Sequence, residues 1–302
     1  MEKLLEVKDL KVSFFTDLGE TQAVKDAGFA IEEGDFFGIV GESGSGKSVT
    51  TKSILRLGPS NCRIMGGEIL FQGEDILKKS EAELREIRGG EIAMIFQDSL
   101  SALNPVYTVG NKMVELIRRH TSMTKKEAKA RVLELLTAVG ITDPEKAMRS
   151  YPHELSGGMR QRVMIAMAMS SNPKVLIADE PTTALDVTIQ AQILHLLLEL
   201  QKKNNMSIIL ITHDLGVVAQ TCKRVAVMCG GYVVEEGTVE EIFLNPGHPY
   251  TQALIASMPR VGGTFEQFLE RDLSDGSGNL CPFLNRCKYA DKTCEACLPK
   301  YY

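Results

Sequence analysis

Residues 41–48 read GESGSGKS and directly follow the apolar run FFGIV at residues 36–40. This stretch matches the pattern G-x-x-x-x-G-K-[ST], which forms a phosphate-binding loop when it follows a buried strand and opens a helix. The glycines let backbone amides turn inward around an anion, and the next helix directs its positive N-terminal end to the same place. The stretch therefore predicts a nucleotide-binding α/β domain; the alternative is a glycine-rich turn that happens to contain a lysine.

Each residue type in this loop has a predicted task. Lys47 is expected to reach the β- and γ-phosphates of the nucleotide, and the Ser48 hydroxyl to ligate Mg²⁺. The rest of the predicted nucleotide-binding set in the loop is Gly41, Ser43, Gly44, Ser45, Gly46 and Val49.

Residues 175–180 read VLIADE and predict a buried strand that ends in two carboxylates. Open α/β sheets bind their ligands at the carboxyl ends of the strands. Asp179 is expected to hold Mg²⁺ through water, and Glu180 to orient or deprotonate the water that attacks the γ-phosphate. The alternative is a solvated acidic loop.

Residues 155–162 read LSGGMRQR and lead into a helical run. Ser156 is expected to cap this helix, while Gly157 and Gly158 leave its first amides uncovered as a second anion site. Alone, such a sequence is typical of a helix-starting turn.

Composition limits the classes of protein. The chain has 302 residues, of which 44% are hydrophobic and 24% charged, and it has a net charge of −5. These values exclude a disordered or collagen-like chain, and the negative charge disfavours nucleic acid as a partner. The longest apolar runs are too short to span a membrane and the first residues are too charged for a signal peptide, so we expect a cytoplasmic protein.

Hydrophobic patterning predicts an α/β fold with an antiparallel flank. The apolar runs 36–40, 175–178 and 208–211 predict buried parallel strands, and the near-alternating segments 4–15 and 67–73 predict half-exposed antiparallel strands. Helices are expected at 187–203, capped by Asp186, and at 125–139, where Thr124 and Glu127 form a capping box. We expect a nucleotide-binding domain at 1–240 with a helical subdomain inserted at about 98–172. A C-terminal extension at 241–302 follows, with a linker at 260–279 and a cysteine-rich tail at 281–297.

The set GESGSGKS, LSGGMRQR and VLIADE resembles the motif set of the ATP-binding cassette (ABC) ATPases over about residues 1–240. The resemblance implies a P-loop NTPase cassette that uses ATP and Mg²⁺, with Ser48, Gln97 and Asp179 at the metal and Glu180, His213 and Gln97 in catalysis. It further implies that His213 contacts the γ-phosphate, that Asp186 lies in a loop between subunits, and that Phe14 stacks on adenine, with Phe15 as the alternative. Without the resemblance, His213 reads as a surface histidine and the two phenylalanines as core.

Longer segments, among them MIFQDSLSALNPVYTVG and NPGHPYTQAL, closely resemble the ATPases of dipeptide and oligopeptide importers, whose relatives also serve nickel. This resemblance implies a peripheral subunit at the cytoplasmic face of the membrane. Its partners would be a second ABC ATPase in a homo- or heterodimer, two membrane permease subunits and an extracytoplasmic solute-binding protein. The alternatives are an importer ATPase for nickel or another small solute, and a non-transport ABC ATPase. The sequence does not reveal the solute.

Seven cysteines without a secretion signal argue against a disulfide framework. Cys62, Cys222 and Cys229 are expected in or near the core. The tail cysteines Cys281, Cys287 and Cys294 have the spacing C-x5-C-x6-C, which resembles importer tails that bind a [4Fe-4S] cluster. The family's fourth cysteine lies further on, so either Cys297 substitutes as the fourth ligand or that ligand is missing. Zn²⁺ and plain thiols are the alternatives. We expect this tail to lie apart from every motif that touches ATP.

Overall fold

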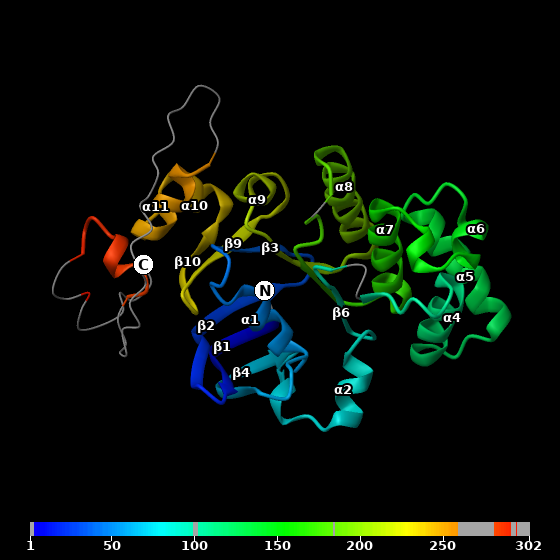
Figure 1. The fold of residues 1–302 in the computed structure, drawn as a ribbon, viewed down its shortest axis with the longest axis horizontal. Coiled ribbons are helices and arrows are strands. Elements are labelled where there is room, and N and C mark those ends of the chain that lie inside the picture. The colour runs from blue at the N-terminus through cyan, green and yellow to red at the C-terminus, as the bar shows by residue number, and fades with distance from the viewer. Residues whose placement is uncertain (1–2, 99–101, 184, 259–280, 291–293, 295–302) are drawn as a thin grey trace. The chain divides into compact units, whose positions relative to one another are not determined.

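The structure is a computed structural model that describes residues 3–98, 102–183, 185–258, 281–290 and 294. The chain divides into two compact units, one made of residues 1–77 and 212–302 and the other of residues 78–211 (Figure 1). The chain leaves the first unit near the short 3-10 helix η1 (Ile76–Lys78). The two units are described in turn.

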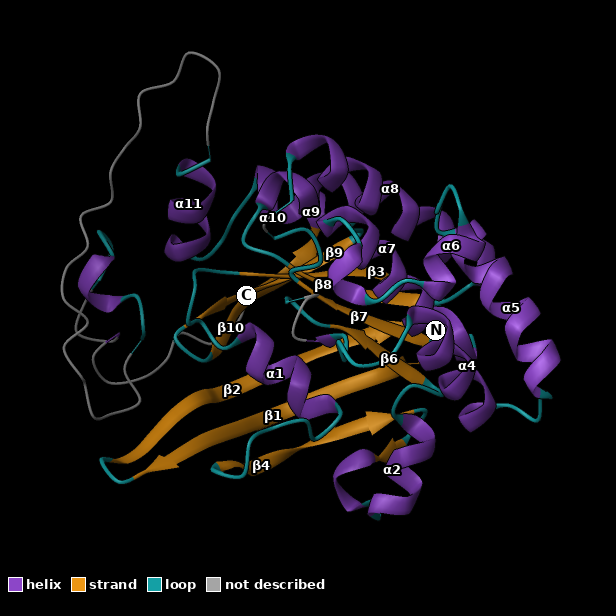
Figure 2. Ribbon diagram, turned by 45° about the vertical axis from the view of Figure 1, so that its right-hand side comes forward, coloured by secondary structure: helices purple, strands orange, loops and turns teal. Residues whose placement is uncertain are grey.

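The first unit contains a mixed sheet with the strand order β5-β4-β1-β2-β10-β9-β3. Its strands are β1 (Lys3–Thr16), β2 (Gly19–Glu32), β3 (Phe36–Val40), β4 (Cys62–Phe71), β5 (Glu74–Asp75), β9 (Arg224–Cys229) and β10 (Tyr232–Thr238). Strand β1 pairs antiparallel with both β2 and β4, whereas β3 pairs parallel with β9 (Figure 2). The predicted α/β class with an antiparallel flank is therefore confirmed.

Strand boundaries show where the sequence pattern is informative. All five residues of β3 are buried, and β3 covers the predicted run 36–40. The strand predicted at 67–73 is placed too late, because β4 begins at Cys62 and Gly73 lies in a turn at φ +82°. Strand β2 is not predicted from the sequence; its first four residues are exposed, and its pairing with β1 shifts register several times.

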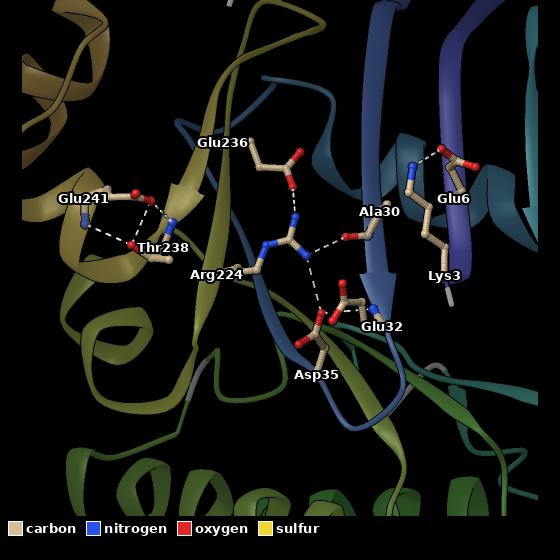
Figure 3. A network of polar contacts seen from close by, with 9 residues as sticks. All are labelled: Lys3, Glu6, Ala30, Glu32, Asp35, Arg224, Glu236, Thr238 and Glu241. Atoms are coloured by element: carbon tan, nitrogen blue, oxygen red, sulfur yellow. Dashed lines mark hydrogen bonds and ion pairs between the residues drawn. The ribbon is translucent and has the colours of Figure 1, made fainter. Parts of the chain in front are cut away.

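Arg224, at the start of β9, ties three strands of this unit together (Figure 3). Its guanidinium donates to the Ala30 carbonyl on β2 at 3.1 Å, forms an ion pair with Glu236 on β10, and lies 3.5 Å from the carboxylate of Asp35. The same guanidinium lies 5.5 Å from the centre of the Phe37 ring on β3. One cation thus links the start of β9 to β2, β3 and β10.

The helices of the first unit cover this sheet and bind the tail. Helix α1 (Lys47–Ile54) packs against β1 and β2. The others are α9 (Leu215–Thr221), α10 (Val239–Leu244), α11 (Pro249–Ala256) and the 3-10 helix η4 (Leu284–Arg286), which is red in Figure 1. Tyr250 on α11 and Phe283 beside η4 make an edge-to-face ring contact with centroids 5.4 Å apart. Both rings belong to one buried cluster with Val225 and Val227 of β9, so this part of the tail is packed onto the unit.

The second unit combines three parallel strands with a set of helices. The strands β6 (Ile92–Ile95), β7 (Val175–Asp179) and β8 (Ser207–Ile211) are ordered β8-β7-β6. The helices are α2 (Glu81–Ile87), α4 (Val109–His120), α5 (Lys125–Ala138), α6 (Pro144–Arg149), η2 (Pro152–Glu154), α7 (Gly157–Ala168), η3 (Met169–Ser171) and α8 (Val187–Asn204). The predicted capping box of Thr124 and Glu127 at α5 and the Asp186 cap of α8 are both confirmed.

The three cysteines outside the tail are core or half-buried, as predicted. Burial raises the pKa of both Cys222 and Cys229 to about 12, and a thiol with so high a pKa is a poor nucleophile at neutral pH. Among the described residues, no helix is both long and apolar enough to cross a membrane.

Candidate nucleotide-binding and catalytic elements

The loop between β3 and α1 carries the motif GESGSGKS and is packed against its neighbours so tightly that two of its positions require glycine. A Cβ atom on Gly41, at φ +152°, would lie 2.1 Å from the carbonyl oxygen of Met228. A Cβ atom on Gly46, at φ +101°, would lie 2.8 Å from the carbonyl oxygen of Ala23. L-residues are strained at such φ values and real Cβ contacts are longer, so both ends of the loop depend on glycine.

Lys47 holds its ammonium group against the backbone of this loop. Its side chain is buried, and Nζ donates to the carbonyl oxygens of Gly41 and Glu42 at 2.8 and 2.9 Å. Ser48 and Val49 are half-buried in the first turn of α1, whereas Ser43 and Gly44 are exposed at the tip of the loop. The cation therefore lies at a loop whose amides can bind an anion.

The tail reaches this loop at Glu42. The Arg286 guanidinium donates to both carboxylate oxygens of Glu42, at 2.8 and 2.9 Å, and the Glu42 backbone N–H donates to the Tyr250 hydroxyl at 2.9 Å. The expectation that the tail lies apart from every ATP motif is therefore wrong. Glu42 and Arg286 are 244 residues apart in sequence, and their contact arises because η4 packs beside α11 in the buried cluster.

The second unit brings Glu180 and Gln97 together at the end of β7. The Oε2 atom of Glu180 accepts from Gln97 Nε2 at 3.0 Å and from the Thr183 hydroxyl at 2.9 Å. Glu180 has φ +45°, and its backbone N–H donates to the Ile211 carbonyl at 3.0 Å. Asp179, the residue before it, is fully buried. The carboxylate of Glu180 is thus held in one orientation at the end of a buried strand, on a backbone conformation that non-glycine residues seldom adopt.

Thr183 is a contact that the sequence analysis misses. Its backbone N–H donates to the Glu180 carbonyl at 3.2 Å, which makes a turn directly after β7. A hydroxyl residue three positions after a carboxylate, in a segment where a strand must turn, is the sequence signal that indicates such a contact.

The segment 155–162 forms the beginning of α7. The Ser156 hydroxyl caps the helix by accepting from the Met159 N–H at 3.3 Å, as predicted. A Cβ atom on Gly158 would lie 3.1 Å from Ile189 of α8, so the absence of a side chain lets this helix start lie close to α8. Asp186 caps α8 through the Ile189 N–H at 2.9 Å. Ser156 and Asp186 are both exposed, while Gly157 and Gly158 are half-buried.

The remaining predicted residues lie as follows. Phe14 and Phe15 are both half-buried on β1, and as successive residues of a strand they point to opposite faces of the sheet. The Arg63 guanidinium lies 5.1 Å from the centre of the Phe15 ring. His213 is exposed two residues after β8. The choice between Phe14 and Phe15 as the adenine-stacking residue stays open.

The cysteines of the tail are only partly described. Cys281 is buried, Cys287 and Cys294 are half-buried, and Cys297 lies outside the described residues. Burial raises the pKa of the Cys281 thiol, and the charges of Cys294 and Cys287 raise it further. Within the described residues, no group of three or more His, Cys, Asp or Glu side chains is placed to hold a metal ion. The described part of the tail thus does not support the predicted [4Fe-4S] or Zn²⁺ site.

Comparison with known proteins connects these elements to a family. The family model described as "ABC transporter" matches residues 24–183, and the model described as "Oligopeptide/dipeptide transporter, C-terminal region" matches residues 234–294.

Curated relatives match over most of the chain. An oligopeptide transport ATP-binding protein of Bacillus subtilis (strain 168), OppD, is 56% identical over 88% of this chain and 75% of its own length. The dipeptide transport ATP-binding protein DppD of the same organism is 50% identical, with 99% of this chain and 91% of the relative covered. The DppD protein of Escherichia coli (strain K12) is 48% identical, with 97% and 91% covered.

A solved structure confirms the fold. The ATP-binding cassette MJ0796, in a dimeric post-hydrolysis state bound to ADP and Pi, superposes with a TM-score of 0.70 at 29% identity, over 78% of this chain and 98% of that one. Together with the matches in sequence, this shows that the chain belongs to the ABC transporter family and carries the C-terminal region of its oligopeptide/dipeptide transporters.

Proposed function

We propose that this chain is the ATP-hydrolysing subunit of a membrane importer for dipeptides and oligopeptides. The observation that carries the proposal is the sequence identity of about 50% between this chain and relatives that are named as dipeptide transport ATP-binding proteins, over nearly the whole of both chains. A relative named as an oligopeptide transport ATP-binding protein is 56% identical. The matched C-terminal region, residues 234–294, supports peptides over nickel as the solute. Its partners are a second ABC ATPase, two permease subunits and a solute-binding protein outside the cell, and it acts at the cytoplasmic face of the membrane.

The loop of residues 41–48 binds the phosphates of ATP in this proposal. Lys47 Nζ, now bound to the Gly41 and Glu42 carbonyls, provides the cation for the β- and γ-phosphates. The amides of Gly41, Ser43, Gly44, Ser45, Gly46 and Val49 and the start of α1 complete the anion site. Phe14 stacks on the adenine, with Phe15 as the alternative.

Glu180 is the proposed general base. Two donors, Gln97 and Thr183, hold its carboxylate in place, so the group is oriented before the reaction begins. His213 contacts the γ-phosphate. The hydroxyl of Ser48, the amide oxygen of Gln97 and the buried carboxylate of Asp179 are oxygen donors of the kind that Mg²⁺ prefers. When bound, Mg²⁺ neutralises charge on the phosphate oxygens.

The start of α7 supplies the second anion site in this proposal, which acts on the ATP of the partner ATPase. Ser156 is exposed at the cap, and Gly157 and Gly158 carry no side chains over the first amides of the helix. Asp186 caps α8, and the start of α8 packs beside the start of α7, so Asp186 belongs to the same surface. Two ATP molecules would favour the closed head-to-tail pair, and loss of the γ-phosphate would let it open.

The [4Fe-4S] cluster, with Zn²⁺ as its alternative, stays a prediction for the tail. The cluster has no part in the catalytic steps above, and among the described residues no group of three or more His, Cys, Asp or Glu side chains is placed to hold a metal ion. Iron, acid-labile sulfide and zinc analysis of protein purified without oxygen tests the prediction, with Cys287→Ser as the control. About four irons per chain that are lost in this variant would support the cluster.

Uptake assays test the proposed function. A strain that lacks this protein is expected to lose uptake of labelled di- and oligopeptides, and the wild-type chain to restore it. The Lys47→Ala variant is expected to fail. Loss of nickel uptake with normal peptide uptake would refute the peptide assignment, and normal uptake of both would refute a role in either transport system.

A further inference from the structure

The ion pair between the tail and the phosphate-binding loop points to a role for the tail in binding nucleotide. We propose that Arg286 neutralises the Glu42 carboxylate and thereby raises the affinity of the loop for the phosphates of ATP, which makes Arg286 a positioning and charge-balancing residue of the nucleotide site. The inference rests on the proposed function of residues 41–48 as the ATP-binding loop.

Glu42 is an unfavourable residue for an anion-binding loop taken alone. It follows Gly41 directly, and its own carbonyl oxygen accepts from Lys47 Nζ at 2.9 Å. Its carboxylate therefore belongs to the predicted phosphate-binding loop itself, and charges separated by less than the screening length, about 8 Å at physiological salt, are only partly shielded from each other. An uncompensated carboxylate at this position would repel the phosphates of ATP.

Arg286 offsets this repulsion through a paired contact with the Glu42 carboxylate. Two guanidinium nitrogens bind the two carboxylate oxygens at 2.8 and 2.9 Å, which is the paired arrangement of a strong charge-assisted contact. The Arg286 side chain is 19% exposed, compared with 47% for Glu42. The guanidinium also lies 5.2 Å from the centre of the Phe283 ring, so the tail itself holds it in place.

The tail around Arg286 packs on the same buried cluster that holds Tyr250 next to the phosphate-binding loop. Phe283 packs edge-to-face on Tyr250, whose hydroxyl accepts from the Glu42 N–H. A Cβ atom on Gly230, which follows β9, would lie 2.5 Å from Cβ of Pro282, so the tail segment lies directly on the chain after β9. Backbone and side chain of Glu42 are therefore both held by the C-terminal region, one by α11 and the other by η4.

Charge compensation and simple bracing make opposite predictions for Glu42. If the pair only braces the fold, removing either partner weakens ATP binding. If Arg286 compensates a harmful charge, removing Arg286 weakens binding, whereas removing the charge of Glu42 leaves binding unchanged or strengthens it. The pair is partly exposed, so the expected effect is about threefold to tenfold in Kd.

The experiment measures the Kd of MgATP by calorimetry on the full chain, with the melting temperature of each variant. Arg286→Ala is expected to raise Kd about threefold to tenfold. Glu42→Gln is expected to leave Kd equal or lower, and the double variant Glu42→Gln/Arg286→Ala to return within twofold of wild type. Arg286→Lys keeps the positive charge but loses the paired guanidinium contact, so its Kd is expected to lie between those of wild type and Arg286→Ala.

Two controls separate this inference from the proposed function. Lys288→Ala removes a cation two residues further along the tail and is expected to leave Kd unchanged. Lys47→Ala is expected to abolish ATP binding, and if it did not, the assignment of the loop itself would be wrong. If Lys47→Ala lost binding but Arg286→Ala kept it, or if Glu42→Gln weakened binding as Arg286→Ala does, the charge-compensation role alone would be overturned.

Discussion

Replacing Gly41 with alanine tests whether the close packing of the phosphate-binding loop shapes the nucleotide site. The added Cβ would lie 2.1 Å from the Met228 carbonyl oxygen and 2.8 Å from the Ser45 hydroxyl, at a backbone φ of +152° that strains an L-residue. The serine can rotate away. The carbonyl cannot, because Met228 lies in β9, which is paired with β3 on one side and β10 on the other.

The size of the effect follows from this contact. Ordinary van der Waals contact begins at 3.4 Å, so the Cβ is about 1.3 Å too close and the loop has to move by a similar distance. Such a shift also disturbs the 2.8 Å hydrogen bond from Lys47 Nζ to the Gly41 carbonyl. Misplacement of binding groups by about 1 Å can lower a rate about a hundredfold, and the strained backbone costs a further 1–3 kcal/mol or so of stability.

We therefore expect Gly41→Ala to bind MgATP at least about tenfold more weakly and, in the assembled transporter, to hydrolyse it about a hundredfold more slowly. The matched control is Gly19→Ala, which also has a positive φ, +121°, but no atom within 4 Å of the added Cβ. This control should lose stability and keep its affinity for ATP. Binding and turnover within threefold of wild type for Gly41→Ala would refute the claim that packing against β9 shapes the site.

Three further predictions concern catalysis, assembly and pH. Glu180→Gln is expected to bind MgATP but to hydrolyse it about 10² to 10⁴ times more slowly, since the general base is lost; wild-type turnover in the assembled transporter would show that Glu180 is not the base. Because the second anion site comes from a partner, the isolated chain is expected to be monomeric with little ATPase activity, and Ser156→Arg to block hydrolysis on the opposing subunit; full activity of a strictly monomeric preparation would contradict this. Burial lowers the pKa of His248 from its ordinary value of 6.5, against the opposing charge of Glu235, and its Nδ1 accepts the Tyr250 N–H at 3.0 Å. This histidine therefore binds a proton more readily in the unfolded chain than in the folded one, so the stability of the fold falls as pH drops through about 6.5. Melting curves between pH 7.5 and 5.5 should show a smaller decrease in melting temperature for His248→Asn, which keeps a capping acceptor, than for wild type. An equal decrease would assign the pH dependence to other groups.

Local features of the structure were predictable because they depend on residues close in sequence. The cap of α5 joins Thr124 to Glu127, and the cap of α8 joins Asp186 to Ile189, each three residues apart. The buried strand β3 is a short apolar run followed by the glycine-rich loop, and this order alone indicates the nucleotide-binding fold. The roles of the loop, of Asp179 and of Glu180 stay predictions, which rest on residue types that suit phosphate and magnesium.

Contacts between distant segments of the chain could not be predicted from the sequence and emerge only in the folded structure. The register shifts of β2 arise from its pairing with β1, and the orientation of Glu180 depends on Gln97, which comes from a loop 83 residues earlier. The pair of Glu42 and Arg286 is the clearest case, because its partners meet only when Phe283 packs on Tyr250 in the core of the first unit. Sequence patterns report which side chains seek burial or charge partners within a few residues, but apolar burial is non-directional, so it does not specify which distant segments will share a core.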